Sequence, residues 1–121
     1  MKILLAAVLS LLLFGNAQAK ETTFIFAHIN ESIMPIQRGE KYEDPLDDFL
    51  RQKGLGEVTG GGTAQSANGK IEWVGVDIEL VDIEKNLPVL IHKLKELGAP
   101  KGSFFEYTLK NKPFKKYIHN E

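Results

Sequence analysis

Two acidic side chains, Asp77 and Glu79, have the spacing in this sequence that most readily supports chemistry. They alternate with apolar residues in the segment IEWVGVDIELV, so a β-strand would place both carboxylates on one face of a sheet. Paired carboxylates can act as general acid and base, or can bind a hard cation. Acids at positions i and i+2 are also typical of a solvated strand face, and we expect neither catalysis nor a metal here.

Histidine, cysteine and serine offer no alternative chemistry. The three histidines, His28, His92 and His119, lack the close spacing of a zinc site. The chain has no cysteine, which excludes thiol catalysis and cysteine-ligated metals. The serines lack the context of a nucleophile elbow. We therefore predict no catalytic residue, no metal and no cofactor.

Residues 30–43 form a 14-residue connection, which is longer than the usual link between a strand and a helix. Ile33, Met34, Ile36 and Tyr42 are too apolar for a free loop, so they either pack on the sheet or contact a partner. Arg38 in the same loop could hold an anion. We include Ile33, Met34, Arg38 and Tyr42 among the candidate binding residues.

Three consecutive glycines, Gly60 to Gly62, resemble a phosphate loop only superficially, because the Gly-Lys-Ser/Thr ending and the following helix are missing. Within a strand they predict a bulge, or bare backbone against which the indole of Trp73 lies. Close approach of a ligand is the alternative.

Apolar periodicity and turn residues predict the elements that position these groups. Strands are expected at 22–29, 57–65, 70–81 and 103–109, with helices after Asp44 and Asn86 and a basic, aromatic tail at the end. This order, βαββαβ, predicts an α+β fold of the ferredoxin-like, split βαβ type. The four-stranded antiparallel sheet would have the order 4-1-3-2, with both helices on one face.

The dipeptide Asn68-Gly69 predicts a two-residue hairpin turn. That turn would place Ala64 opposite Trp73, Gly62 opposite Gly75 and Gly60 opposite Asp77. Trp73, Asp77 and Glu79 would then project from the uncovered face of the sheet. The neighbouring strand would add Phe24, Phe26 and His28. An uncovered aromatic patch indicates an interface.

The N-terminus has the features of an export signal. Lys2 precedes an apolar run from Ile3 to Phe14, and Ala17-Gln18-Ala19 matches the small-x-small cleavage pattern. We predict a secretory signal peptide at 1–19 and one domain at 20–121, with no membrane-spanning segment after cleavage. The expected location is the periplasm or the exterior, since an exported domain without disulfides fits a periplasm best.

Charge is unevenly distributed. Residues 31–84 contain 12 acids and 5 bases, although the whole chain has a net charge of −1. This excess of acids suits a basic protein partner and disfavours nucleic acid. The lysines at 110, 112, 115 and 116 could contact membrane phosphates or an acidic partner, or form a solvated edge.

Three stretches, RGEKYEDPLDDFL (38–50), GLGEVTGGGTAQSANGKIEW (54–73) and ELGAPKGS (96–103), resemble a pattern in small exported bacterial proteins. The resemblance brings no activity or catalytic residue with it. Some small exported proteins of this kind are immunity factors or inhibitors, so it implies a binding role by analogy.

Taken together, these observations predict an exported, non-catalytic protein-binding module of the inhibitor or immunity type. Its contact residues would be Ile33, Met34, Arg38, Tyr42, Trp73, Asp77 and Glu79. One alternative is a small-ligand or minor enzymatic site between the 30–43 loop and the sheet, where Arg38 and His28 would converge with an acid. Another is a homodimer formed through the open sheet face.

Overall fold

The computed structural model describes residues 21–120. The predicted signal peptide and its cleavage site lie outside these residues.

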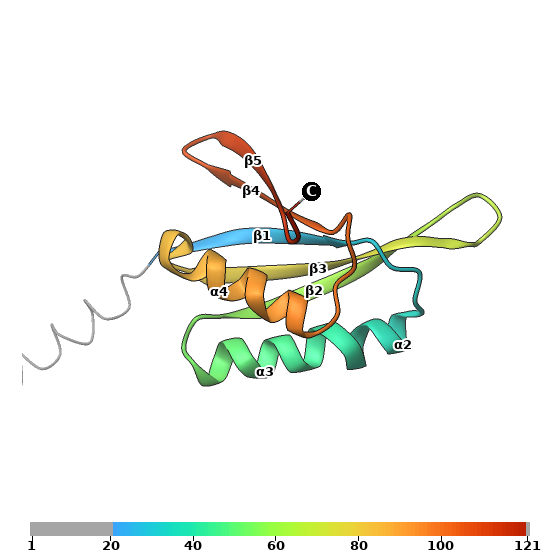
Figure 1. Cartoon of the computed structure of the whole chain (residues 1–121), viewed down its shortest axis with the longest axis horizontal. Helices are drawn as coiled ribbons and strands as arrows, with labels where there is room; N and C mark the ends of the chain where they lie inside the picture. The colour runs from blue at the N-terminus through green and yellow to red at the C-terminus, as the bar shows by residue number, and fades with distance from the viewer. Residues whose placement is uncertain (1–20, 121) are drawn as a thin grey trace, which may run out of the picture.

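A five-stranded antiparallel sheet forms the centre of the fold, with the strand order β2-β3-β1-β4-β5 (Figure 1). The α+β class predicted from the sequence is confirmed. The strands are β1 (Thr22–Ile29), β2 (Gly56–Gln65), β3 (Ile71–Val81), β4 (Phe104–Leu109) and β5 (Lys112–Tyr117).

The predicted four-stranded, ferredoxin-like arrangement is wrong, because the expected basic tail forms β5. Strand β5 pairs with β4 along its whole length, from Leu109 opposite Lys112 to Phe104 opposite Tyr117. Lys110 and Asn111 connect the two strands with positive φ angles of 50° and 65°. Two successive residues with positive φ are typical of a tight hairpin turn that matches the strand twist.

The helices are α2 (Pro35–Arg38), η1 (Gly39–Glu43), α3 (Asp44–Gln52) and α4 (Ile83–Glu96). The first three are consecutive, so the predicted loop at 30–43 is wrong from Pro35 onward. Pro45 cannot donate a backbone hydrogen bond, which normally interrupts a helix. Here the amide of Asp44 bonds the carbonyl of Gly39, five residues earlier, and this wider turn continues directly into α3.

Helix α4 also begins earlier than predicted, at Ile83 rather than after Asn86. The side chain of Asn86 is buried inside the first turns and donates to the carbonyl of Val81 at 2.6 Å. Asn86 therefore ties α4 to the end of β3 instead of capping the helix.

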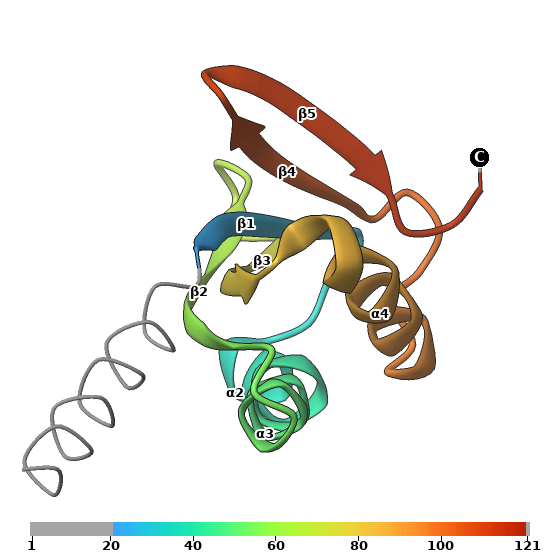
Figure 2. The same ribbon diagram turned by 90° about the vertical axis from the view of Figure 1, so that its left-hand side faces the viewer.

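One hydrophobic core lies between the helices and one face of the sheet (Figure 2). Alternate residues of β1 and β3 face the helices and are buried, together with Tyr42, Leu46, Leu50, Leu90 and Leu94. The intervening residues of β1 and β3 face away from the core, on the open face of the sheet. The β4–β5 hairpin extends the sheet away from the helices.

The register of the β2–β3 hairpin is confirmed, because Ala64 pairs with Trp73, Gly62 with Gly75 and Gly60 with Asp77. The turn itself differs from the prediction. The amide of Ser66 donates to the carbonyl of Lys70, and the carbonyl of Ser66 accepts from the amide of Gly69. Of the two predicted turn residues, only Gly69 has a positive φ, of 84°. This longer turn shifts the register by one residue, and the irregularity between Ala64 and Gln65 restores it. A further irregularity lies between Val58 and Gly60.

Candidate functional site

Three rings from adjacent strands form a row across the open face. The imidazole of His28 on β1 stacks on the indole of Trp73 on β3, with ring centroids 4.1 Å apart. Its other side stacks on Phe104 of β4 at 4.4 Å. We call Trp73, His28 and Phe104 the aromatic row. Such stacking on uncovered sheet surface creates a rigid, largely apolar platform.

Phe26 extends the aromatic row by an edge-to-face contact with Trp73, at 5.9 Å between centroids. Its ring lies over Gly75, where a Cβ would come within 2.5 Å of the ring carbon Cζ. The absence of a side chain at Gly75 therefore leaves the space that the ring of Phe26 occupies. The predicted bulge agrees with the register shift between Val58 and Gly60, at the start of the glycine run. The alternative, that the indole lies on the run, is wrong, because Gly62 has nothing within 4 Å of its Cβ position.

Carboxylates flank the phenylalanines of β1 on both sides. On β3, Glu79 pairs in register with Phe24, and Asp77 pairs with Phe26. On β4, Glu106 pairs with Phe26. Phe24 is 53% exposed, although it is a large apolar side chain. We call Phe24, Phe26, Asp77, Glu79 and Glu106 the acidic strip.

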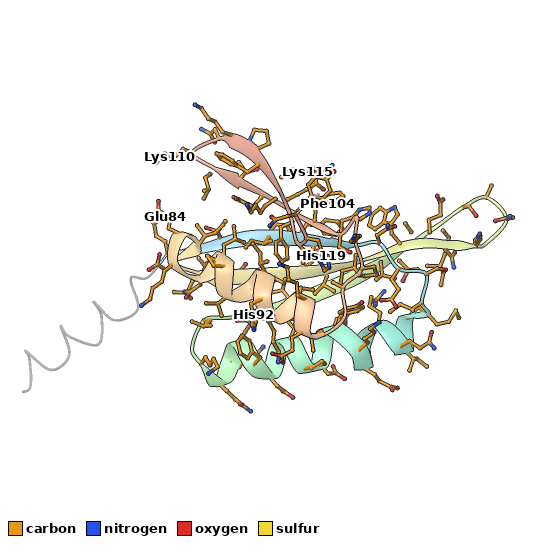
Figure 3. The ribbon with its side chains drawn as sticks, in the orientation of Figure 1. Glu84, His92, Phe104, Lys110, Lys115 and His119 are labelled. Carbon is orange, nitrogen blue, oxygen red and sulfur yellow. The ribbon has the colours of Figure 1, made fainter. Side chains whose placement is uncertain are left out.

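Lys115 of β5 lies directly opposite Glu106 in the strand register. Its ammonium nevertheless lies over the ring of Phe104, 4.0 Å from the centroid, and 5.1 Å from that of Tyr117 (Figure 3). None of the ion pairs among residues 21–120 includes Glu106. The Glu106 carboxylate is thus exposed to solvent. The ammonium of Lys115 makes a cation–π contact with Phe104 instead.

A shallow pocket of about 310 Å³ lies beside Glu106. Phe24 and Phe26 of β1 form part of its lining, and Pro113 and Phe114 of β5 contribute to it as well. The pocket is mainly apolar and its lining contains one carboxylate, that of Glu106. This combination can accept an apolar group that carries a positive charge.

The pKa of His28, at the centre of the aromatic row, is shifted. Burial between its neighbouring rings lowers the pKa below the ordinary value of 6.5. The charge of Glu106 raises it, and the charge of Lys115 lowers it further. His28 is therefore a neutral aromatic ring at neutral pH.

Arg38, a predicted binding residue, is engaged within the fold. Its guanidinium pairs with Glu43 and donates to the hydroxyl of Thr63 on β2 at 2.6 Å, and only 15% of its side chain is exposed. Gly61 makes room for this pair, because a Cβ there would collide with the Glu43 carboxylate. Arg38 and Glu43 thus fasten the first helix to the glycine-rich strand.

The other predicted loop residues also lie away from the aromatic row. Tyr42 is fully buried in the core and donates its hydroxyl to Glu31, which also accepts from Lys41 at 2.8 Å. Burial, and then the Glu31 carboxylate, raise the pKa of Tyr42. Ile33 packs against the core, while Met34 is exposed just before α2. The structure therefore places Trp73, Asp77 and Glu79 on the open face of β3, but it does not place the four loop residues there.

Arg38 and His28 do not converge. Arg38 contacts Thr63, whose strand partner Val74 faces the core, whereas His28 stacks on the open face. The space that would form a ligand site between the 30–43 segment and the sheet holds the Arg38–Glu43 pair and the ring of Tyr42.

A larger cavity, of about 740 Å³, lies near Glu84 and Lys110 (Figure 3). Its charged lining mixes signs, with Glu21, Asp82 and Glu84 beside Lys53, Lys85 and Lys110. Mixed charges of this kind favour no single class of charged ligand. Sequence reasoning did not identify this cavity.

Within residues 21–120, no group of three or more His, Cys, Asp or Glu side chains could hold a metal ion. The described helices include none that is both long and apolar enough to cross a membrane. Comparison of the chain with protein-family models, with curated proteins and with solved structures finds no match.

Sequence reasoning missed Phe104, Glu106 and Lys115 as parts of this surface. Phe104 and Glu106 were expected only as members of the last strand, and Lys115 as part of a tail. The only local signal was the pair Lys110-Asn111 between two short runs that contain aromatic residues, FFEYTL and KPFKKY.

Proposed function

We propose that this chain is an exported, non-catalytic module that binds a basic protein partner through the open face of its sheet. By analogy with small exported inhibitors and immunity proteins, its binding would block the partner. The aromatic row provides the apolar contact, and the acidic strip provides the charge that attracts the partner.

One observation carries this proposal: an exposed phenylalanine, Phe24, and a partly exposed one, Phe26, lie on uncovered sheet between carboxylates of two different strands. Phe24 and Phe26 have Asp77 and Glu79 on one side and Glu106 on the other. Interfaces are enriched in aromatic residues, and a rigid ring that is already stacked loses little conformational entropy on binding. Carboxylates around such rings mainly increase the association rate with a basic partner.

The direct experiment is to tag the exported protein, express it in its own periplasm, crosslink it and identify what it captures. Alanine at Trp73 should weaken binding of the captured partner by about 2 kcal/mol, because truncation removes an interface anchor. The matched control is Ile36→Ala, which truncates an exposed apolar side chain on α2, on the helix side of the sheet, and should leave affinity unchanged.

Two results would contradict the proposal. Capture that is unaffected by Trp73→Ala would remove the open face as the docking surface. Light scattering that shows only a stable dimer, with no foreign partner, would favour self-association through this face instead.

A further inference from the structure

We infer that the pocket beside Glu106 receives a lysine or arginine side chain of the partner. This inference rests on the proposed function and specifies the chemical group that the open face recognises.

The acidic strip places aromatic rings between carboxylates. Phe26 lies in register between Asp77 on β3 and Glu106 on β4. Phe24, two residues before Phe26 in β1, lies in register with Glu79 and is more than half exposed. A long side chain lying across these rings would have a carboxylate on either side. The aliphatic stems of lysine and arginine cover apolar surface while their charged ends stay at its polar margin.

The carboxylate of Glu106 forms no ion pair with any residue among 21–120. Lys115 is its direct cross-strand neighbour, and opposite charges at such positions normally attract each other. The ammonium of Lys115 lies instead over Phe104 at 4.0 Å. Glu106 therefore presents a carboxylate without an ion pair from any described residue, directly at the pocket.

The open face already contains a cation that lies on aromatic rings. Lys115 on Phe104 and Tyr117 is an intramolecular example of an alkylammonium on aromatic rings. The pocket presents the same ring chemistry, its lining includes Glu106, and no lysine or arginine among residues 21–120 lines it. A volume of about 310 Å³ is at the small end of ligand pockets, which suits one side chain better than a larger metabolite.

The inference can be tested without knowing the partner, by titrating the exported protein with Nα-acetyl-arginine methylamide and following its amide NMR signals. The matched probe is Nα-acetyl-citrulline methylamide, which has nearly the same shape but no charge. The arginine probe should move the signals of Phe24, Phe26 and Glu106 at millimolar concentration, and the citrulline probe should bind about fivefold more weakly.

Three variants locate the site. Glu106→Gln should weaken arginine binding about fivefold by removing the charge, and Phe24→Leu should weaken it by removing a ring while keeping apolar volume. Asp48→Asn, on the exposed side of α3, should leave it unchanged. The one-dimensional spectrum of each variant shows whether it is folded.

Equal binding of both probes, signal changes away from the pocket, or an unaffected Glu106→Gln variant would each overturn the inference. These failures differ from failure of the proposed function. If Trp73→Ala weakens binding of the partner but Glu106→Gln changes the titration with neither probe, the docking surface is supported and the cation pocket is wrong. If arginine binds as expected but no foreign partner is captured, the pocket remains and the proposed function is wrong.

Discussion

The imidazole of His28 lies nearly parallel to the indole of Trp73, with 4.1 Å between centroids and 25° between planes. Phe104 stacks on the opposite side of the same imidazole. A titratable ring thus occupies the centre of the proposed docking face, with Glu106 and Lys115 as the charges that act on it.

The first prediction follows from the lowered pKa of His28. The unfolded chain binds this proton more tightly, so the free energy of unfolding should fall as the pH drops below about 6.5 and level off below the folded pKa. Above that window His28 contributes no pH dependence. Urea unfolding at pH 7.5 and 5.5 should show a smaller loss for His28→Phe, which keeps a stacked ring. His92→Gln, on the exposed side of α4, is the control, and equal losses in all three proteins would refute the assignment.

The second prediction concerns Gly75 under the ring of Phe26. Gly75→Ala should lower the free energy of unfolding by about 1 kcal/mol, because its Cβ would force the ring to move. Its cross-strand partner supplies the control, since Gly62→Ala meets nothing within 4 Å and should be nearly neutral. Chemical denaturation measures both, and equal stability of the two variants would show that Phe26 does not lie there.

The third prediction separates stability from binding at Arg38. Arg38→Met should lower the free energy of unfolding by about 2 kcal/mol, because it leaves the Glu43 carboxylate and the Thr63 hydroxyl without their donor. Arg51→Met removes two more exposed ion pairs, with Asp47 and Glu57, and should lower the free energy of unfolding less than Arg38→Met does. A stable Arg38→Met variant with weakened partner affinity would instead support the contact role expected from the sequence.

The fourth prediction tests the β4–β5 hairpin. Lys110 and Asn111 both have positive φ, which costs an ordinary residue roughly 1 kcal/mol. The double change Lys110→Asn and Asn111→Gly should therefore raise the melting temperature, because Asn-Gly prefers this turn. Lys101→Asn, at a position without positive φ, is the control. No gain from the double change would argue that residues 112–117 do not pair with β4.

The β2–β3 register was predictable, because the alternation from Val74 to Leu80 allows one arrangement that buries the apolar side chains. Its turn was less predictable. Asn68-Gly69 favours a two-residue turn locally, yet a longer turn with a compensating irregularity gives the same pairing.

Other elements depended on tertiary contacts that local signals do not report. Asp44-Pro45 has the features of a helix start, yet packing of Tyr42 and the Arg38–Glu43 pair extends helical structure back to Pro35. Strand β5 is exposed along its length, so no apolar periodicity marks it. The open-face members on β3 were therefore predicted, whereas Phe104, Glu106 and Lys115 were not.

The docking face itself is tested most directly by site-specific photo-crosslinking in the native compartment. A photoreactive phenylalanine analogue would replace Phe24 on the open face in one protein, and Ile36 on α2 in another. Both positions are exposed and apolar, at 53% and 75%, but they lie on different sides of the sheet. The proposed function predicts a crosslink to a foreign, basic protein from position 24 and none from position 36. A crosslink from position 36 alone, or only to a second copy of this chain, would contradict it.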